Sequence, residues 1–184
     1  PCGIGTYNPS QGQTACLSCP AGQSQPATGQ QSCVPCLPGQ NQPADGQDVC
    51  VPCDGGQSQI DPGQSSCLNC PPGQYAAIPS SSATTGAVVC QPCAAGFFAV
   101  TSGQVQCQAC PAGTEQPSPG QTDCKRCTPG RFSSSTNGNT ACADAPIGSY
   151  VPDDGAYTFT ACPAGTFSNV TGATACTPCQ AGSA

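Results

Sequence analysis

Several residue types are scarce or absent in this sequence, and each absence excludes a class of protein. The 184 residues contain no His, Met or Trp, and charged residues make up only 7 %, against roughly a quarter in an ordinary globular domain. With three Lys and Arg residues and a net charge of −6, binding to nucleic acid or to an anionic membrane surface is not expected, because both require clustered cations. No apolar run approaches the ~20 residues of a membrane span, so we also expect no membrane insertion.

Side chains for catalysis are equally scarce. The sequence has no His, a single Glu (Glu115) and Asp residues that mostly stand alone, so no acid–base pair or activated nucleophile can be assembled. We therefore expect no enzymatic activity, no catalytic residue and no cofactor. Asp153-Asp154-Gly155 would offer carboxylate oxygens to calcium, but a plain turn is the favoured interpretation.

Cysteine, glycine and proline are abundant instead. Nineteen cysteines in 184 residues indicate a disulfide scaffold, and such scaffolds persist only where the surroundings oxidise thiols. We therefore expect a secreted, extracellular or cell-surface protein whose cross-links replace a large hydrophobic core. Because Met is absent and the first residue is Pro1, we expect a processed product or a piece of a longer protein.

The cysteines and glycines define about ten tandem repeats of ~17 residues. C-x-x-C pairs recur at Cys16/Cys19, Cys33/Cys36, Cys50/Cys53, Cys67/Cys70, Cys90/Cys93, Cys107/Cys110, Cys124/Cys127 and Cys176/Cys179. Each repeat runs from the second Cys of one pair, its leading position, to the first Cys of the next, its closing position. One glycine follows the leading position by three residues: Gly5, Gly22, Gly39, Gly56, Gly73, Gly96, Gly113, Gly130, Gly148 and Gly165. A second precedes the closing position by four residues: Gly12, Gly29, Gly46, Gly63, Gly86, Gly103, Gly120, Gly138, Gly155 and Gly172.

The local sequence of a repeat predicts a two-stranded loop. In Cys19-Pro20-Ala21-Gly22 the positions of Pro and Gly suit a type I turn. The second glycine is expected where the chain reverses, with a positive φ or a close backbone approach. Gly and Pro leave no uninterrupted helical window. The predicted fold is therefore small and disulfide-rich, without helix, with tandem one-bridge β-loop repeats stacked into an elongated rod or solenoid.

One repeat that lacks both its cysteines indicates how the others pair. Ala145 stands at a leading position and Phe159 at the closing position of the same repeat. If bridges formed within each C-x-x-C, this loss would orphan Cys142 and Cys162 separately, whereas a bridge within each repeat would be removed cleanly. The predicted bridges are Cys2–Cys16, Cys19–Cys33, Cys36–Cys50, Cys53–Cys67, Cys70–Cys90, Cys93–Cys107, Cys110–Cys124, Cys127–Cys142 and Cys162–Cys176.

This pairing leaves Cys179 over, either because a longer array is truncated or because it bridges to a neighbouring chain. The expected organisation is eight disulfide-closed repeats over 1–144, a degenerate repeat over 145–161, a further repeat over 162–178 and the start of a truncated repeat over 179–184. In the degenerate repeat, Tyr150, Tyr157 and Phe159 are hypothesised to form an apolar staple that replaces the missing bridge.

Other interpretations of the same motifs are weaker. Paired C-x-x-C motifs resemble zinc ribbons, but the paired loss of two cysteines, the absence of His and the odd cysteine total argue against a metal site. A thioredoxin-like redox motif would need a βαβ context, which is missing. Asn169-Val170-Thr171 is an N-glycosylation sequon, and the stretch 80–85 suits either O-glycosylation or a flexible insertion.

The repeat, with its C-P-x-G start and its G-x-x-x-C-x-x-C end, resembles the ephrin-receptor-like cysteine-rich repeat and is similar to the single-bridge modules of tumour-necrosis-factor-receptor cysteine-rich domains. The match is clearest over 2–16, 93–107 and 162–176. The resemblance implies elongated extracellular rods, found in receptors, matrix proteins and large surface proteins, and implies no particular ligand-binding residue.

Two functions follow as expectations. The first is a structural subunit of an extracellular filament, cell-surface appendage or coat, with copies of itself as partners, and with glycans as a second class of partner. It is favoured by nearest-neighbour stacking of repeats and by the low charge. A third feature is the recurring Gly-Gln of Gly12-Gln13, Gly29-Gln30, Gly46-Gln47 and Gly63-Gln64. The side-chain amides of these glutamines could bond between copies or be ordinary solvated surface. The alternative is the stalk or ligand-binding ectodomain of a receptor or adhesin.

Overall fold

The regular structure of this protein consists of two-residue strands. The structure, a computed structural model, describes residues 1–10, 12, 14–80 and 83–180, and no helix occurs in these ranges. The strands in this part of the chain are β1 (Thr6–Tyr7), β2 (Leu17–Ser18), β3 (Gln23–Ser24), β4 (Val34–Pro35), β5 (Gln40–Asn41), β6 (Val51–Pro52), β7 (Gln57–Ser58), β8 (Leu68–Asn69), β9 (Gln74–Tyr75), β10 (Gln91–Pro92), β11 (Phe97–Phe98), β12 (Gln108–Ala109), β13 (Thr114–Glu115), β14 (Lys125–Arg126), β15 (Arg131–Phe132), β16 (Ala143–Asp144), β17 (Ser149–Tyr150), β18 (Thr160–Ala161), β19 (Thr166–Phe167) and β20 (Thr177–Pro178).

Each repeat contributes one strand pair. Every odd-numbered strand of the described chain bonds to the next even-numbered one in a separate two-stranded sheet. In the first repeat β1 and β2 are antiparallel, with Thr6 opposite Ser18 and Tyr7 opposite Leu17. The second strand occupies the two residues between one repeat's closing position and the next repeat's leading position, which in most repeats are the two residues inside a C-x-x-C. The fold class expected from the sequence, small, disulfide-rich and helix-free with tandem strand pairs, is thus confirmed. Of the described pairs, β17–β18 alone has no bridge that closes its loop.

The turn before each first strand differs from the expected one. In the second repeat the Gln23 N–H donates to the Pro20 carbonyl at 3.1 Å, so the turn begins at Pro20 and not at Cys19. Gly22 then takes its third position, with a φ of +83°. A positive φ at that position is the mark of a type II turn, so the expected type I turn is wrong by one residue and in type.

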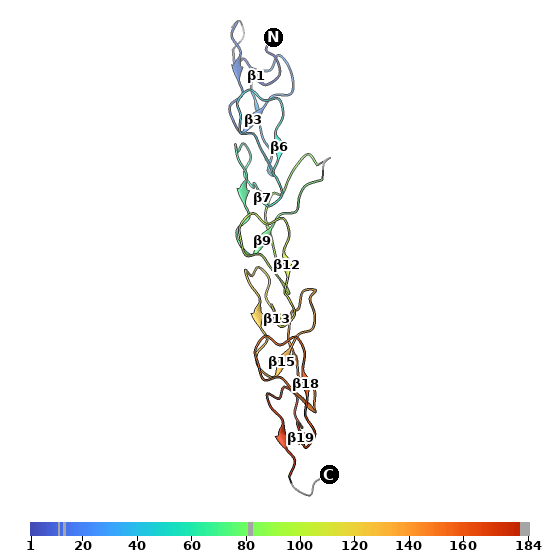
Figure 1. The fold of residues 1–184 in the computed structure, drawn as a ribbon. Helices are drawn as coiled ribbons and strands as arrows, with labels where there is room; N and C mark the ends of the chain where they lie inside the picture. Colours follow the sequence, from blue (N-terminus) through green and yellow to red (C-terminus); the bar gives the residue numbers. More distant parts are fainter. Residues whose placement is uncertain (11, 13, 81–82, 181–184) are drawn as a thin grey trace. The chain divides into compact units, whose positions relative to one another are not determined.

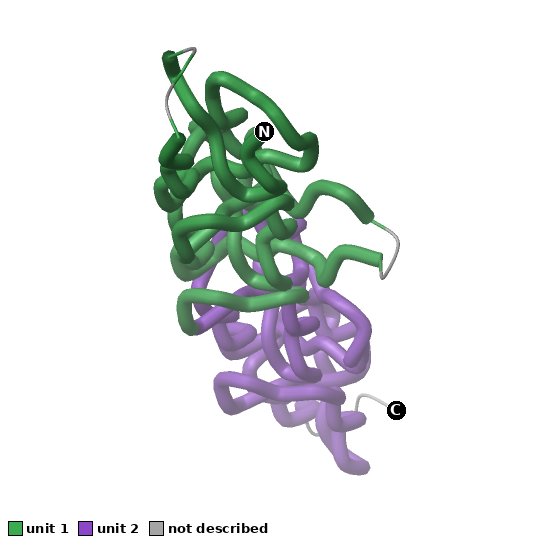
Figure 2. Tube along the Cα trace, turned by 90° about the horizontal axis from the view of Figure 1, so that it is seen from above, with its two compact units in different colours: residues 1–91, 101–106 green, residues 92–100, 107–184 purple. Residues whose placement is uncertain are grey.

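The chain divides into two compact units (Figure 2): residues 1–91 with 101–106, and residues 92–100 with 107–184. Within the first unit the labelled strands β1, β3, β7 and β9 follow one another in chain order (Figure 1). Within the second, β13, β15, β18 and β19 do the same. No helix in the described ranges is long and apolar enough to cross a membrane.

Sulfur takes the place of a conventional core. The leading cysteines of the first eight repeats are buried, from 0 % exposed at Cys19, Cys70, Cys93, Cys110 and Cys127 to 5 % at Cys2, whereas Cys162 is half-buried. Most large aliphatic side chains, by contrast, lie on the surface, for example Leu68 at 65 % and Ile78 at 71 % exposed. A loop this small cannot bury enough apolar surface to offset its ordering entropy, so the bridges and the contacts between repeats hold it.

Candidate functional site: the junction between repeats

The disulfides of the described chain join the leading and closing cysteines of the same repeat. Their Cα–Cα distances lie between 5.6 and 5.8 Å, within the ordinary range for a bridge. They are Cys2–Cys16, Cys19–Cys33, Cys36–Cys50, Cys53–Cys67, Cys70–Cys90, Cys93–Cys107, Cys110–Cys124, Cys127–Cys142 and Cys162–Cys176, the same pairs that the sequence predicts. Cys179 is exposed and free.

Neighbouring repeats are joined by a recurring set of three backbone hydrogen bonds. At the first junction these are Gly5 N–H to Gln25 O (2.8 Å), Asn8 N–H to Gln30 O (3.0 Å) and Gly29 N–H to Cys2 O (2.8 Å). The same three positions bond in the second unit: Gly96 N–H to Gln116 O (2.7 Å), Ala99 N–H to Gln121 O (3.1 Å) and Gly120 N–H to Cys93 O (2.7 Å). Because these bonds use only main-chain atoms, the junction tolerates wide variation in side chains.

Repeats two apart also touch, and this contact explains the first glycine of most repeats. A Cβ placed on Gly5 would lie 2.1 Å from the Gly46 carbonyl oxygen, and one on Gly22 would lie 2.1 Å from that of Gly63. Any side chain at these positions would therefore push the next-but-one repeat away.

The second glycine is explained mostly by φ, with one exception. Gly46 has a φ of +72°, as expected. Gly86, in the longer fifth repeat, is not among the glycines with positive φ, but a Cβ there would lie 2.4 Å from the Cys53 carbonyl oxygen. Both reasons that the sequence offers for the second glycine therefore occur.

A buried glutamine spans the loop in four repeats, a role that the sequence alone did not reveal. Gln25, 4 % exposed, donates from Nε2 to the Ser32 carbonyl at 2.6 Å and accepts the Ala27 N–H on Oε1 at 3.0 Å. Gln42, Gln59 and Gln116 make the same two bonds to residues seven and two positions further on. At this position Ser133 is too short to span the loop, and its buried Oγ has no hydrogen-bond partner in the described structure.

The Gly-Gln glutamines contribute to the junctions through their main chain. The main-chain oxygens of Gln30, Gln47 and Gln64 accept junction hydrogen bonds. Their side-chain Nε2 atoms donate to a carbonyl two residues earlier in their own loop, at 3.3, 3.2 and 3.5 Å. Gln13, the first of the series, lies outside the described residues.

The degenerate repeat keeps its junctions although it lacks a bridge. Its neighbours on both sides donate and accept the full set of bonds: Gly130 N–H to Val151 O, Ser133 N–H to Ala156 O, Gly155 N–H to Cys127 O, Gly148 N–H to Ser168 O, Val151 N–H to Ala173 O and Gly172 N–H to Ala145 O, all between 2.8 and 3.1 Å. Ala145, at the leading position, is completely buried. This repeat is therefore held by its neighbours.

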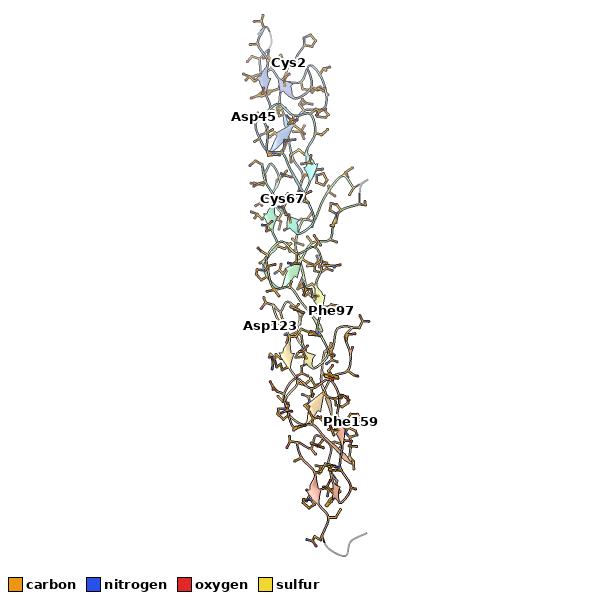
Figure 3. The ribbon with its side chains drawn as sticks, in the orientation of Figure 1. Cys2, Asp45, Cys67, Phe97, Asp123 and Phe159 are labelled. Carbon is orange, nitrogen blue, oxygen red and sulfur yellow. A yellow bond between two sulfur atoms is a disulfide. The ribbon has the colours of Figure 1, made fainter. Side chains whose placement is uncertain are left out.

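One repeat normally contacts the disulfide of the next, and an aromatic pair replaces this contact where the disulfide is missing. In other repeats the side chain five residues after the leading position lies against the next repeat's bridge: Ser24 Oγ is 3.4 Å from Cys50 Sγ, and Ser58 Oγ is 3.2 Å from Cys90 Sγ. The corresponding Phe132 packs edge-on against Phe159, with ring centroids 5.1 Å apart. The position of Phe159 in the chain is marked in Figure 3. The hypothesised staple of Tyr150, Tyr157 and Phe159 is thus wrong in its members, because Phe159 pairs with Phe132 and Tyr157 is 65 % exposed.

The chain's two arginines are engaged with acidic side chains in the second unit. Arg131 lies 3.7 Å from Glu115 Oε1 and 3.2 Å from Asp144 Oδ1 and donates to the Cys142 carbonyl, whose own N–H donates to Glu115 Oε2. These contacts fasten the closing end of the eighth repeat, whose bridge encloses one residue more than most. Arg126 lies 3.5 Å from Asp154 Oδ2.

The remaining candidates from the sequence are the metal site, the N-glycosylation sequon and the stretch 80–85. No group of three or more His, Cys, Asp or Glu side chains able to hold a metal ion occurs among the described residues. Asn169, Val170 and Thr171 are exposed. Ser81 and Ser82, within the stretch expected to be O-glycosylated or flexible, lie outside the described residues, as does 181–184 of the truncated repeat.

The strand pairs, bridges and junctions define a small extracellular-type repeat scaffold, and comparison with known proteins identifies its family. A family model described as tyrosine-protein kinase ephrin type A/B receptor-like matches residues 1–32, 39–85 and 80–124, together more than half of the chain. The chain belongs to this ephrin-receptor-like family, which confirms the resemblance seen in the sequence. Repeats of this kind are structural, non-catalytic modules, and their bridges are typical of an extracellular domain. A search of curated proteins found no match.

Proposed function

We propose that this chain is a non-catalytic spacer of a secreted or cell-surface protein, in which disulfide-closed repeats resist extension under tension. The observation that carries the proposal is the position of each bridge, which encloses nearly the whole repeat. Of a 17-residue repeat, only the two residues between the cysteines of a C-x-x-C lie outside a closed loop. A pulling force therefore passes from bridge to bridge and bypasses the loops.

The covalent path through a repeat shows how much its bridge limits the extension of that repeat. From Cys2 to Cys19 the path crosses one bridge, 5.6 Å between Cα atoms, and three peptide steps of about 11 Å in total. A bridged repeat therefore reaches about 16 Å at most, whereas 17 extended residues reach about 60 Å. The bridges reduce the maximum length of a repeat by roughly a factor of four.

Force spectroscopy on the non-reduced chain, held by tags at both ends, tests the spacer. Each bridge of sequence separation 14 that is opened by reductant under load should add about 43 Å, which is 14 peptide steps less the distance across the bridge. Cys70–Cys90, with a separation of 20, should add about 64 Å. An oxidised chain that already stretches to the full length of its 184 residues would contradict the proposal.

A filament or coat subunit is the second candidate, and one surface feature favours it. The residue after the closing cysteine is aliphatic and exposed in four successive repeats of the first unit: Leu17 at 49 %, Val34 at 52 %, Val51 at 43 % and Leu68 at 65 %. An apolar surface built from these four side chains would suit contact with a further copy of the chain. The low charge offers little repulsion between copies.

Electron microscopy of native, non-reduced protein over a range of concentrations separates the two candidates. Filaments that form with the natural sequence, and fail to form when all four aliphatic residues are changed to Ser, would establish a homopolymer. Particles that stay separate at every concentration would contradict the filament proposal and would be consistent with a spacer that does not self-assemble. Changing Ile78, which is also exposed but lies outside this series, is the matched control.

A further inference from the structure

Each repeat has a corner that faces solvent, seven residues after the leading position. All ten residues at this position are exposed: Pro9, Pro26, Pro43, Ile60, Ala77, Val100, Pro117, Ser134, Pro152 and Asn169. The residue just before the corner is buried in most repeats, as at Gln25 and Ser168. The backbone thus turns outward at this position, and a large group attached there would meet solvent and not a neighbouring repeat.

The tenth repeat places a complete sequon on this corner. Asn169, Val170 and Thr171 are all exposed, Val170 at 57 %. The inward contacts lie on both sides of them: Ser168 Oγ donates to the Val170 carbonyl at 2.9 Å, and Gly172 N–H donates to the Ala145 carbonyl at 2.8 Å. The junction therefore uses main-chain atoms at the edges of the sequon and leaves its side chains outside.

From this placement we propose that Asn169 carries an N-linked glycan. The sequence Asn-Val-Thr satisfies the acceptor rule, since the middle residue is not proline. The Nδ2 atom attacks the reducing-end carbon of an oligosaccharide carried on a lipid diphosphate. A carbon–nitrogen bond forms, the carbon–oxygen bond to the diphosphate breaks, the amide loses one proton, and the lipid diphosphate leaves. The glycan then covers the outer corner of the tenth repeat, so this corner makes no close contact with another protein.

A second corner of the chain provides a matched control. The second repeat reads Pro26-Ala27-Thr28-Gly29 where the tenth reads Asn169-Val170-Thr171-Gly172. The substitution Pro26→Asn therefore creates a sequon at the equivalent exposed corner. Thr171→Ala removes the natural sequon while it keeps Asn169.

The experiment is secretion of the chain from a eukaryotic cell, followed by treatment with peptide-N-glycosidase without denaturation. We expect one step of mobility shift for the natural chain, none for Thr171→Ala and two for Pro26→Asn. A natural chain that does not shift, whether or not Pro26→Asn adds a glycan, overturns the proposal. A shift that appears only after reduction and denaturation also overturns it, because the glycan would then not lie on an exposed corner.

Discussion

The degenerate repeat should be the segment that lengthens most when the oxidised chain is pulled. Between Cys142 and Cys162 no bridge shortens the covalent path, so its 20 peptide steps can extend to about 70 Å. The double substitution Ala145→Cys with Phe159→Cys restores cysteines at the leading and closing positions. Strands β17 and β18 keep the same antiparallel register there as in bridged repeats, with Ser149 opposite Ala161, so a bridge should form.

The covalent path between Cys142 and Cys162 gives the expected change in stretched length. With the new bridge, six peptide steps and one disulfide of ordinary Cα–Cα distance span the segment, about 27 Å in all. The fully stretched oxidised variant should therefore be about 43 Å shorter than the natural chain. Single-molecule force extension without reductant measures this difference, and reductant should abolish it. Equal lengths in a variant whose new bridge is verified by mass spectrometry would refute the reasoning.

Three further predictions concern single residues. Gln25→Ala leaves the Ala27 amide without its acceptor, at a cost of about 2 kcal/mol, so hydrogen exchange at that amide should accelerate about 30-fold. Gln30→Ala, on the surface, should change the exchange rate of the Ala27 amide little. Equal acceleration by the two substitutions would contradict the buried role of Gln25. Phe159→Ser removes the ring packed on Phe132 and should raise proteolysis within 145–161, whereas Phe167→Ser, at similar exposure but in a bridged repeat, should not; equal sensitivity of the two variants would count against the pairing. Gly22→Ala should lower the denaturation midpoint of the first unit strongly, because its Cβ would meet a carbonyl oxygen at 2.1 Å; an unchanged midpoint in urea would show that the close approach is absent.

The sequence was sufficient for the repeat frame and the pairing of cysteines. Both depend on residues with few alternatives: a cysteine needs a partner in an oxidising environment, and a glycine repeated at one position signals a backbone requirement. The paired absence of cysteine at Ala145 and Phe159 then distinguished bridges within repeats from bridges within each C-x-x-C.

The details that the sequence did not provide depend on contacts between repeats. Pro20 suits either of two neighbouring turn positions, and the structure places Gly22 at positive φ against the Gly63 carbonyl two repeats away. Phe132 could not be identified as the partner of Phe159 without knowing that one repeat's first strand lies against the next repeat's bridge. The buried Gln25 is the exception, since a glutamine recurs at the same position in four repeats and this recurrence is visible in the sequence.

Peptide mapping of the non-reduced protein tests the central claim most directly, because the spacer depends on which cysteines are joined. Digestion between the repeats, with free thiols blocked first, should release disulfide-linked peptides that join leading to closing cysteines, such as Cys19 to Cys33 and Cys36 to Cys50, and only Cys179 should carry the blocking group. A peptide in which Cys16 is bonded to Cys19 would contradict the account, because the force path would then run through every loop.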